Sequence, residues 1–244
     1  MADWLGAVGV SVTLAARNIS ALDDVAARIQ SRGGQARVVP SDITSFTACR
    51  HAVAIGCDTF GPHDAIINNA AVVEPLARIQ HTDPAHWQGA MATNLLGPAY
   101  LIHAALPALH RPGGRIINIS TGAAQIPLIA AGAYCTSKAA LDHLSRVVAR
   151  ETPGIVCIAI RPGTMDTPMQ RLLRARGPRH MPTEQAAFYH RIHEDGLLEP
   201  PHVPGRAIAW AALHAPIQWS GSILDVDDPR LAEPALRFFG DCLE

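Results

Sequence analysis

The chain contains 244 residues with 20 basic and 21 acidic side chains, which gives a formal net charge of -1. A balance this close to neutral argues against a protein that coats nucleic acid or binds an anionic membrane through a basic surface. With 48% hydrophobic and 17% charged residues, the composition excludes a disordered chain and is typical of a globular protein with a sizeable core.

Short runs rich in β-branched residues alternate with longer segments whose apolar residues recur every three or four positions. This alternation predicts an α/β fold in which helices cover both faces of a doubly wound parallel sheet. In chain order, strands are expected at residues 10–16, 36–39, 65–68, 115–120, 155–160 and 222–226. Helices are expected at residues 20–32, 45–55, 87–109, 132–151 and 203–214, with a helical, proline-containing excursion at residues 166–201.

Local signals set the ends of the first long helix. Ser20 is the expected N-cap, Asp23 occupies the capping-box position, and Gly33-Gly34 ends the helix. No internal repeat, low-complexity tract or Gly/Ser-rich linker divides the sequence. We therefore expect residues 1–244 to form a single domain.

Five scattered cysteines show no CxxC pair and no metal-ligand spacing: Cys49, Cys57, Cys135, Cys157 and Cys242. They are expected to be free thiols that pack as small hydrophobic groups in a reducing compartment, and no metal site is predicted. The uncharged stretch at residues 4–16 is too short for a membrane-spanning helix. It follows Asp3 instead of a basic segment, although its Leu14-Ala15-Ala16 end leaves a signal peptide as the alternative. A cytoplasmic location is expected.

Tyr134 precedes Lys138, the single lysine of the chain, by four residues in a predicted helix. Both side chains then lie on one helix face, about one turn apart. At roughly 4 Å and an effective dielectric constant of about 20, one positive charge lowers the pKa of a phenol by about 3. A phenol with an ordinary pKa of about 10 would titrate near 7, where a general acid–base works best. The same spacing also fits a half-buried aromatic residue beside a solvated charge.

Three more polar segments follow predicted strands, where a parallel α/β sheet places its working residues. They are Asn68-Asn69-Ala70-Ala71, Ser120 and Pro162-Gly163-Thr164. From residue 10 to the last strand the sequence resembles the short-chain dehydrogenase/reductase family. The family's Asn-Asn-Ala-Gly signature corresponds to residues 68–71, and its catalytic Asn, Ser, Tyr and Lys correspond to Asn94, Ser120, Tyr134 and Lys138.

The resemblance implies a Rossmann-like fold and a reaction mechanism. Tyr134 would donate a proton to a substrate carbonyl oxygen while a nicotinamide delivers hydride, and Ser120 would hydrogen-bond that oxygen. Lys138 would lower the pKa of the phenol and hold the nicotinamide ribose. Asn94 would anchor a water molecule that relays protons to Lys138.

Cofactor preference is predicted by Arg17, at the end of the strand at residues 10–16. An arginine here can accept a 2′-phosphate, whereas an acidic residue would bind the ribose 2′-hydroxyl, so NADP(H) is expected. The alternative is a surface arginine that begins a loop. The resemblance further implies that Asp42 contacts adenine and that Tyr134 and Lys138 also contact the cofactor. It assigns the adenosine ribose to Asn69 and Ala70, and the nicotinamide amide to Pro162, Gly163, Thr164 and Thr167.

Within the family the resemblance is to fungal sepiapterin-reductase-like proteins, including benzil reductases. It rests on Val73-Glu74-Pro75, on residues 138–143 and 165–170, and on the segment from Leu224 to Ala232. Such a protein would reduce ketones or vicinal diketones, and it would form a dimer or tetramer through the helices at residues 87–109 and 132–151. Candidate pocket residues lie in the excursion: Met169, Leu172, Phe188 and Tyr189. Simple helix packing explains these four equally well.

One part of the family pattern is absent before Arg17. No Thr-Gly-x-x-x-Gly-x-Gly turn is present, and Gly6-Ala7-Val8-Gly9 has neither its spacing nor a preceding strand. The strands at residues 10–16 and 36–39 already fill the family's second and third positions, so we expect the fold to lack the first strand and the Gly-rich turn, through an incomplete gene model or a spliced product. Two hypotheses follow: an NADPH-dependent carbonyl reductase, or a catalytically impaired relic or interaction subunit.

Overall fold

The computed structural model describes residues 1–109 and 112–240. Every predicted strand is present, with its ends moved by no more than a few residues. The strands are β1 Ser11–Ala16, β2 Gln35–Pro40, β3 Ala65–Asn68, β4 Arg115–Ile119, β5 Val156–Arg161 and β6 Ile223–Asp225. The α-helices are α1 Ala2–Ala7, α2 Ile19–Ser31, α3 Phe46–Phe60, α4 Pro84–Met91, α5 Gly97–Ala105, α6 Gly132–Glu151, α7 Pro168–Arg176, α8 Thr183–Glu194, α9 His202–His214 and α10 Pro229–Phe239.

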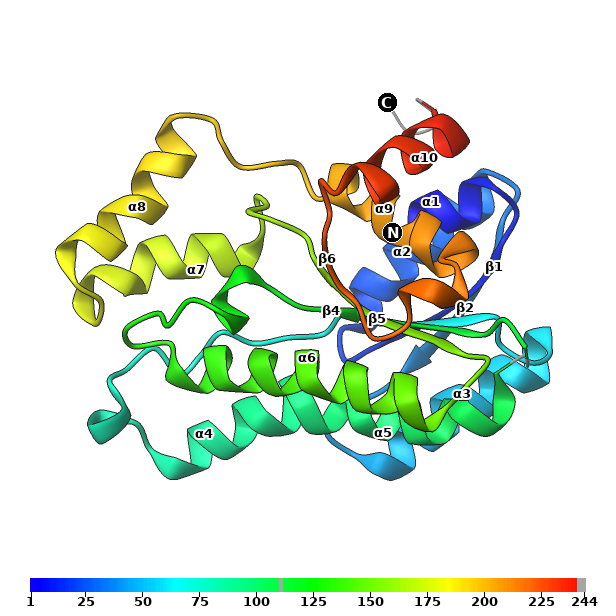
Figure 1. Cartoon of the computed structure of the whole chain (residues 1–244), viewed down its shortest axis with the longest axis horizontal. Helices are drawn as coiled ribbons and strands as arrows, with labels where there is room; N and C mark the ends of the chain where they lie inside the picture. The colour runs from blue at the N-terminus through cyan, green and yellow to red at the C-terminus, as the bar shows by residue number, and fades with distance from the viewer. Residues whose placement is uncertain (110–111, 241–244) are drawn as a thin grey trace.

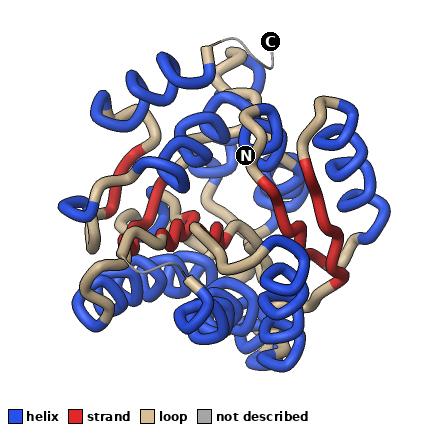
Figure 2. Tube along the Cα trace, turned by 90° about the vertical axis from the view of Figure 1, so that its right-hand side faces the viewer, coloured by secondary structure: helices blue, strands red, loops and turns tan. Residues whose placement is uncertain are grey.

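All the strand pairs are parallel, but they form two separate sheets. One has the order β1-β2 and the other the order β3-β4-β5-β6. Figure 2 shows the two groups of strands apart from each other. Helices α1, α2 and α9 contact strands on one side, while α3, α5 and α6 contact them on the other (Figure 1). The predicted doubly wound α/β fold is therefore confirmed, and its sheet is interrupted between β1 and β3 within the described residues.

The side chain of Trp4 connects the two sheets on one face. It is 1% exposed and packs with Leu5, Ala209 and Phe239 in a cluster that also touches Val12 of β1 and Ile67 of β3. Its indole nitrogen donates a 2.8 Å hydrogen bond to the His202 carbonyl at the start of α9. Burial of so large an aromatic group stabilises this junction by about 2–3 kcal/mol.

The turn between α1 and β1 contains Gly9, whose φ of +81° favours glycine. This segment enters a strand, whereas a phosphate-binding turn leaves one for a helix. Its position agrees with the expectation that residues 6–9 are not the family's Gly-rich turn. Gly6 has a packing role instead, because an added Cβ would lie 2.7 Å from Cγ2 of Ile29 on α2.

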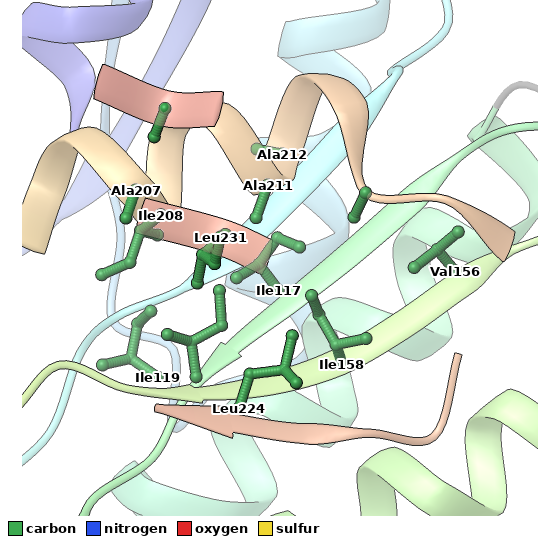
Figure 3. Packing of buried hydrophobic residues seen from close by; sticks show 13 residues of the cluster. Ile117, Ile119, Val156, Ile158, Ala207, Ile208, Ala211, Ala212, Leu224 and Leu231 are labelled. Atoms are coloured by element: carbon green, nitrogen blue, oxygen red, sulfur yellow. The ribbon is translucent and has the colours of Figure 1, made fainter. Parts of the chain in front are cut away.

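The largest core cluster lies between the four-stranded sheet and α9. Side chains from β4, β5 and β6 pack there against α9 and α10, including Ile117, Ile158, Leu224, Ile208 and Leu231 (Figure 3). All six residues of β5 are buried, as its apolar sequence predicts for a strand covered on both faces. This rigid centre fixes the strand ends that carry the candidate site.

Two of the predicted helices differ in their limits from the sequence prediction. The N-cap of α2 is Asn18, which accepts a 3.1 Å hydrogen bond from the Ala21 N–H, whereas Ser20 lies inside the helix. The expected helix at residues 87–109 is divided into α4, a π-helical turn at Ala92–Leu96, and α5. Pro98 explains the division, because it has no N–H to donate to the Asn94 carbonyl four residues earlier.

Helix α10 is absent from the sequence prediction. Asp228 caps it by accepting a 3.0 Å hydrogen bond from the Arg230 N–H, and Pro229 occupies its first turn, where a missing N–H costs nothing. Leu231 and Phe239 bury its inner face. Within residues 1–109 and 112–240, no helix is long and apolar enough to cross a membrane.

Candidate active site

Asn94 lies in the π-helical turn and joins two parts of the candidate site. Its Oδ1 accepts a 2.8 Å hydrogen bond from the Val72 N–H, and its Nδ2 donates to the Val72 carbonyl at 2.8 Å and to Ser137 Oγ at 3.1 Å. The side chain is fully buried. Because its amide group is committed to protein partners, a water relay at this position would have to use the main chain. Asn94 thus anchors the segment after β3 to α6.

Lys138 points from α6 to the end of β4. Its Nζ donates a 2.7 Å hydrogen bond to the Ile119 carbonyl, and the residue is 2% exposed. Ser120, the residue after Ile119, is also buried, and its N–H donates a 2.8 Å hydrogen bond to the Ile160 carbonyl. The Ser120 hydroxyl has no partner among the described residues. A buried hydroxyl without a partner is costly, which makes this strand end a place where a ligand oxygen would be bound.

The electrostatics of Tyr134 differ from the sequence prediction. Burial raises the pKa of its phenol, and the neighbouring Thr121 hydroxyl opposes part of this rise. Burial also lowers the pKa of Lys138 to about 8, although the Asp142 carboxylate acts in the opposite direction. The expected fall in the pKa of Tyr134 was therefore wrong for the protein alone, because the loss of water on burial is the largest effect and outweighs the hydrogen bond with Thr121.

Arg17 and Asp42 lie together beyond the carboxyl ends of β1 and β2. These strands pair in register, with Ala16 opposite Pro40, and both side chains are exposed. Hydrogen bonds from the main chain and hydroxyl of Thr44 lower the pKa of Asp42, and the Arg17 guanidinium adds to this effect. The two residues expected at the adenosine half of the cofactor are thus neighbours, but they belong to the smaller sheet.

The residues at the end of β3 and just after it fall into two groups. One group is buried and hydrogen-bonded within the protein, and the other is exposed. Asn68 is buried, and its Nδ2 donates to Asn118 Oδ1 at 2.7 Å. Asn118 Nδ2 donates in turn to Ser145 Oγ on α6 at 2.8 Å. Asn69 and Ala70 are exposed, so they remain available for the expected ribose contact.

The loop after β5 holds the residues expected at the nicotinamide amide. Pro162 is buried, whereas Gly163, with φ +74°, and Thr164 are exposed. The Thr164 carbonyl accepts a 2.9 Å hydrogen bond from the Glu199 N–H, which closes the base of the excursion. Thr167 caps α7, because its hydroxyl accepts a 3.4 Å hydrogen bond from the Gln170 N–H. Thr167 therefore has a structural role as the N-cap of α7.

The excursion forms α7 and α8, which project beyond the end of the sheet (Figure 1). Their apolar side chains form a cluster with the segment after β3. Tyr134, Met169 and Leu172 pack against it, and Tyr189 is one of its buried members. Phe188 is 41% exposed and lies outside the cluster, and its ring makes an edge-to-face contact with that of Tyr189. Three of the four predicted pocket residues thus lie in the same apolar cluster as Tyr134.

The four described cysteines are free thiols, as expected, but only two of them are buried as the sequence prediction requires. Cys49 and Cys157 are free and buried, while Cys57 and Cys135 are free and partly exposed. Cys242 lies outside the described residues. Sequence reasoning also missed the buried carboxylate of Asp142, which lies one helical turn after Lys138 and was visible in the spacing of α6.

Comparison with known proteins identifies the family of the chain. The family model described as short chain dehydrogenase matches residues 1–177. An uncharacterized oxidoreductase of Saccharomyces cerevisiae, YIR035C, is 32% identical over 80% of this chain and 78% of its own length. A benzil reductase ((S)-benzoin forming) of the same yeast, IRC24, is 30% identical over 70% of this chain and 69% of its own length.

A solved structure shows the same fold. The crystal structure of YIR035C superposes with a TM-score of 0.86, at 30% identity, over 92% of this chain and 88% of that one. The match to the family model covers β1 to β5 and α6, and so it includes every residue expected to act in catalysis or to bind the cofactor. On this evidence the chain belongs to the short-chain dehydrogenase family and is an oxidoreductase.

Proposed function

We propose that the chain is an NADPH-dependent carbonyl reductase that converts a ketone or a vicinal diketone to an alcohol. The observation that carries this proposal is the buried, unpartnered Ser120 hydroxyl beside the carbonyl that holds Lys138. Tyr134 lies on the same helix as Lys138, next to the apolar cluster of the excursion. A polar strand end beside an apolar wall suits a carbonyl group attached to apolar substituents.

The described residues fit both ends of NADP(H). The orphaned Ser120 hydroxyl and the exposed Gly163-Thr164 loop suit the nicotinamide end, and the exposed Arg17 suits a 2′-phosphate. Lys138, Tyr134, Asn69 and Ala70 would hold the two riboses. When bound, this cofactor supplies the hydride that reduces the carbonyl carbon.

The residues of the chain supply the proton and stabilise charge. Ser120 donates a hydrogen bond to the carbonyl oxygen, and Tyr134 transfers its phenolic proton to that oxygen as negative charge develops. The raised pKa of Tyr134 keeps the phenol protonated at neutral pH, as a proton donor requires. The Lys138 ammonium then stabilises the phenolate that remains.

The relatives support the substrate class. One of them is named as a benzil reductase, and benzil is a vicinal diketone with two aromatic rings. The apolar cluster beside Tyr134 contains Val73, Leu173 and Met181, which suit aromatic substituents. We therefore propose an aryl ketone or diketone as the substrate class.

The test is NADPH oxidation in the presence of benzil. Tyr134→Phe removes the proton donor and keeps the ring, so turnover should fall by roughly 10²–10⁴-fold. Tyr100→Phe is the matched control, because Tyr100 lies on α5 and makes an edge-to-face contact with Phe46. Wild-type turnover by the Tyr134 variant would contradict the proposal.

The interrupted sheet favours a second candidate function. No strand pairs with the inner edge of β1 or of β3 in the described residues, and no Gly-rich turn is present to bind pyrophosphate. A catalytically impaired relic or interaction subunit would show this pattern. Titration of the 244-residue chain with NADPH, followed by fluorescence, separates the candidates: tight binding contradicts the second, and absence of binding contradicts the first.

We further propose that the protein is cytoplasmic and forms a dimer or tetramer. Exposed apolar side chains support assembly through α6 and the preceding helical segment, namely Leu96 and Val147. Light scattering tests the assembly, and a monomer at all concentrations would contradict it.

A further inference from the structure

A buried ion pair lies behind the candidate site. Arg161, the last residue of β5, places Nη2 3.3 Å from Oδ2 of Asp142 on α6, and both side chains are almost completely buried. Arg161 Nη1 also donates a 3.0 Å hydrogen bond to Gln125 Oε1. One guanidinium group therefore connects the strand that leads to Pro162, the helix that carries Lys138, and the segment that follows Ser120.

This ion pair is incompletely satisfied. Asp142 Oδ1 and Arg161 Nε have no hydrogen-bond partner among the described residues. Burial of two charges costs several kcal/mol per ion, and an incomplete set of hydrogen bonds recovers this cost poorly. A gain in stability is thus a weak explanation for the pair, and an effect on the neighbouring site is a stronger one.

Asp142 lies four residues after Lys138, on the same face of α6. Asp142 is the charged group that acts on Lys138, and from β4 the ammonium group meets the Ile119 carbonyl. Tyr134 lies one turn before Lys138 on α6, and Arg161 of β5 pairs with Asp142. Asp142 is the acidic residue in this set. Its carboxylate raises the pKa of Lys138 against the larger effect of burial, which lowers it to about 8.

We propose that Asp142, anchored by Arg161, is a positioning residue that maintains Lys138 as an ammonium group within the buried site. Its effect on turnover rests on the proposed reductase function. The charge coupling itself needs no reaction, because it is a property of the folded chain.

Lys138 is the single lysine of the sequence, so its charge can be measured without enzymatic activity. Carbon-13 lysine introduced during expression gives one side-chain NMR signal, which is titrated from neutral to alkaline pH. At a separation of about 6 Å and a dielectric constant of about 20, loss of the carboxylate lowers the titration midpoint by about one to two pH units. Asp142→Asn should show this fall, and the control Glu151→Gln, an exposed acidic residue of the same helix, should not.

A folded Asp142→Asn variant with a wild-type midpoint overturns the proposal. Should that variant unfold because Arg161 loses its buried acidic partner and keeps only the exposed Asp225 carboxylate at 3.9 Å, the double variant Asp142→Asn/Arg161→Met decides the question, since it removes both members of the buried pair. The midpoint of Lys138 should again lie below the wild-type value, because the carboxylate that opposes the effect of burial is missing in this variant too. A midpoint at or above the wild-type value contradicts the coupling.

The catalytic consequence has a separate readout. In Asp142→Asn the alkaline limb of the kcat profile should move to lower pH by the same amount as the NMR midpoint, with KM little changed. If the NMR midpoint of Asp142→Asn is shifted but the alkaline limb of its kcat profile stays at the wild-type pH, the catalytic part of the proposal is overturned. Failure of the wild-type chain to reduce benzil would instead contradict the proposed function, and the NMR titration would still test Asp142.

Discussion

Lys138 and Ile119 are joined by a 2.7 Å hydrogen bond from the ammonium group to the main-chain carbonyl. This bond ties α6 to the end of β4, one residue before Ser120, whose hydroxyl has no partner in the part of the chain that the structure describes. The carbonyl replaces only part of the water that Lys138 loses, so burial still lowers the pKa of the ammonium group to about 8. The candidate site is therefore organised around a group whose burial destabilises the fold.

Lys138→Met should raise the stability of the chain and abolish its proposed activity. The pKa of Lys138 falls from 10.5 to about 8 on folding. At about 1.4 kcal/mol per pKa unit, removal of the desolvated charge raises the free energy of unfolding by up to about 3 kcal/mol near neutral pH. Urea unfolding measures the difference, and a variant less stable than the wild type would contradict the prediction.

The same pKa shift gives a pH dependence. Between about pH 8 and pH 10.5 the unfolded chain binds more protons than the folded chain at Lys138, so the contribution of this residue to stability rises with pH across that window. Below about pH 8 the full cost of burying the charged Lys138 side chain is present. The advantage of Lys138→Met should be largest at neutral pH and should disappear towards about pH 10.5, whereas a constant difference would point to packing.

Asn94→Ala should destabilise the chain by about 2–4 kcal/mol, because it removes three hydrogen bonds and leaves the polar main-chain groups of Val72 unpaired. The Asn94→Asp variant keeps the acceptor for the Val72 N–H, but it buries a carboxylate whose second oxygen faces the Val72 carbonyl, so it should be at least as destabilised as the alanine variant. Thermal and urea unfolding measure both variants. An alanine variant as stable as the wild type would show that the π-helical turn does not depend on this side chain.

The strands were predictable because their signal is local. Residues 155–160 are apolar throughout, and β5 is buried along its whole length. The π-helical turn was missed because apolar periodicity does not register the N–H that Pro98 lacks. Helix α10 was missed because Pro229 and Pro234 argue against a helix until Asp228 is seen to cap it.

Much of the candidate site was also predictable, because its residues follow strands or share a helix face. The pKa of Tyr134 was not. The spacing to Lys138 predicts an attraction between the two groups, but the loss of water that raises the pKa depends on α7 and α8, which are distant in sequence. The ion pair between Asp142 and Arg161 likewise joins a helix to a strand and has no local signature.

Arg17→Ala should weaken NADPH binding relative to NADH. Arg17 is exposed beside Asp42, where a guanidinium would meet a 2′-phosphate, and a charge-assisted pair of this kind is worth about 1.5–3 kcal/mol. The ratio of the two Kd values should then change by roughly 10–100-fold. Arg50→Ala, on the exposed side of α3, is the control for general loss of positive charge. An unchanged ratio in the Arg17 variant would show that specificity is set elsewhere.

Phe188 and Tyr189 offer a matched pair of variants on α8, because they are adjacent in sequence and differ in environment. Tyr189 is 6% exposed and packs in the cluster that Tyr134 also touches, while Phe188 is 41% exposed. Tyr189→Leu should raise the KM for benzil by about tenfold, because it removes ring area from the apolar wall, which is worth about 1–2 kcal/mol. Phe188→Leu should leave KM unchanged, and both variants should retain most of kcat, since neither residue is expected to transfer a proton.

Two outcomes would contradict this prediction. Equal effects of the two substitutions on KM would mean that the substrate lies against the outer face of α8. A loss of kcat in the Tyr189 variant alone would assign its hydroxyl a part in the reaction.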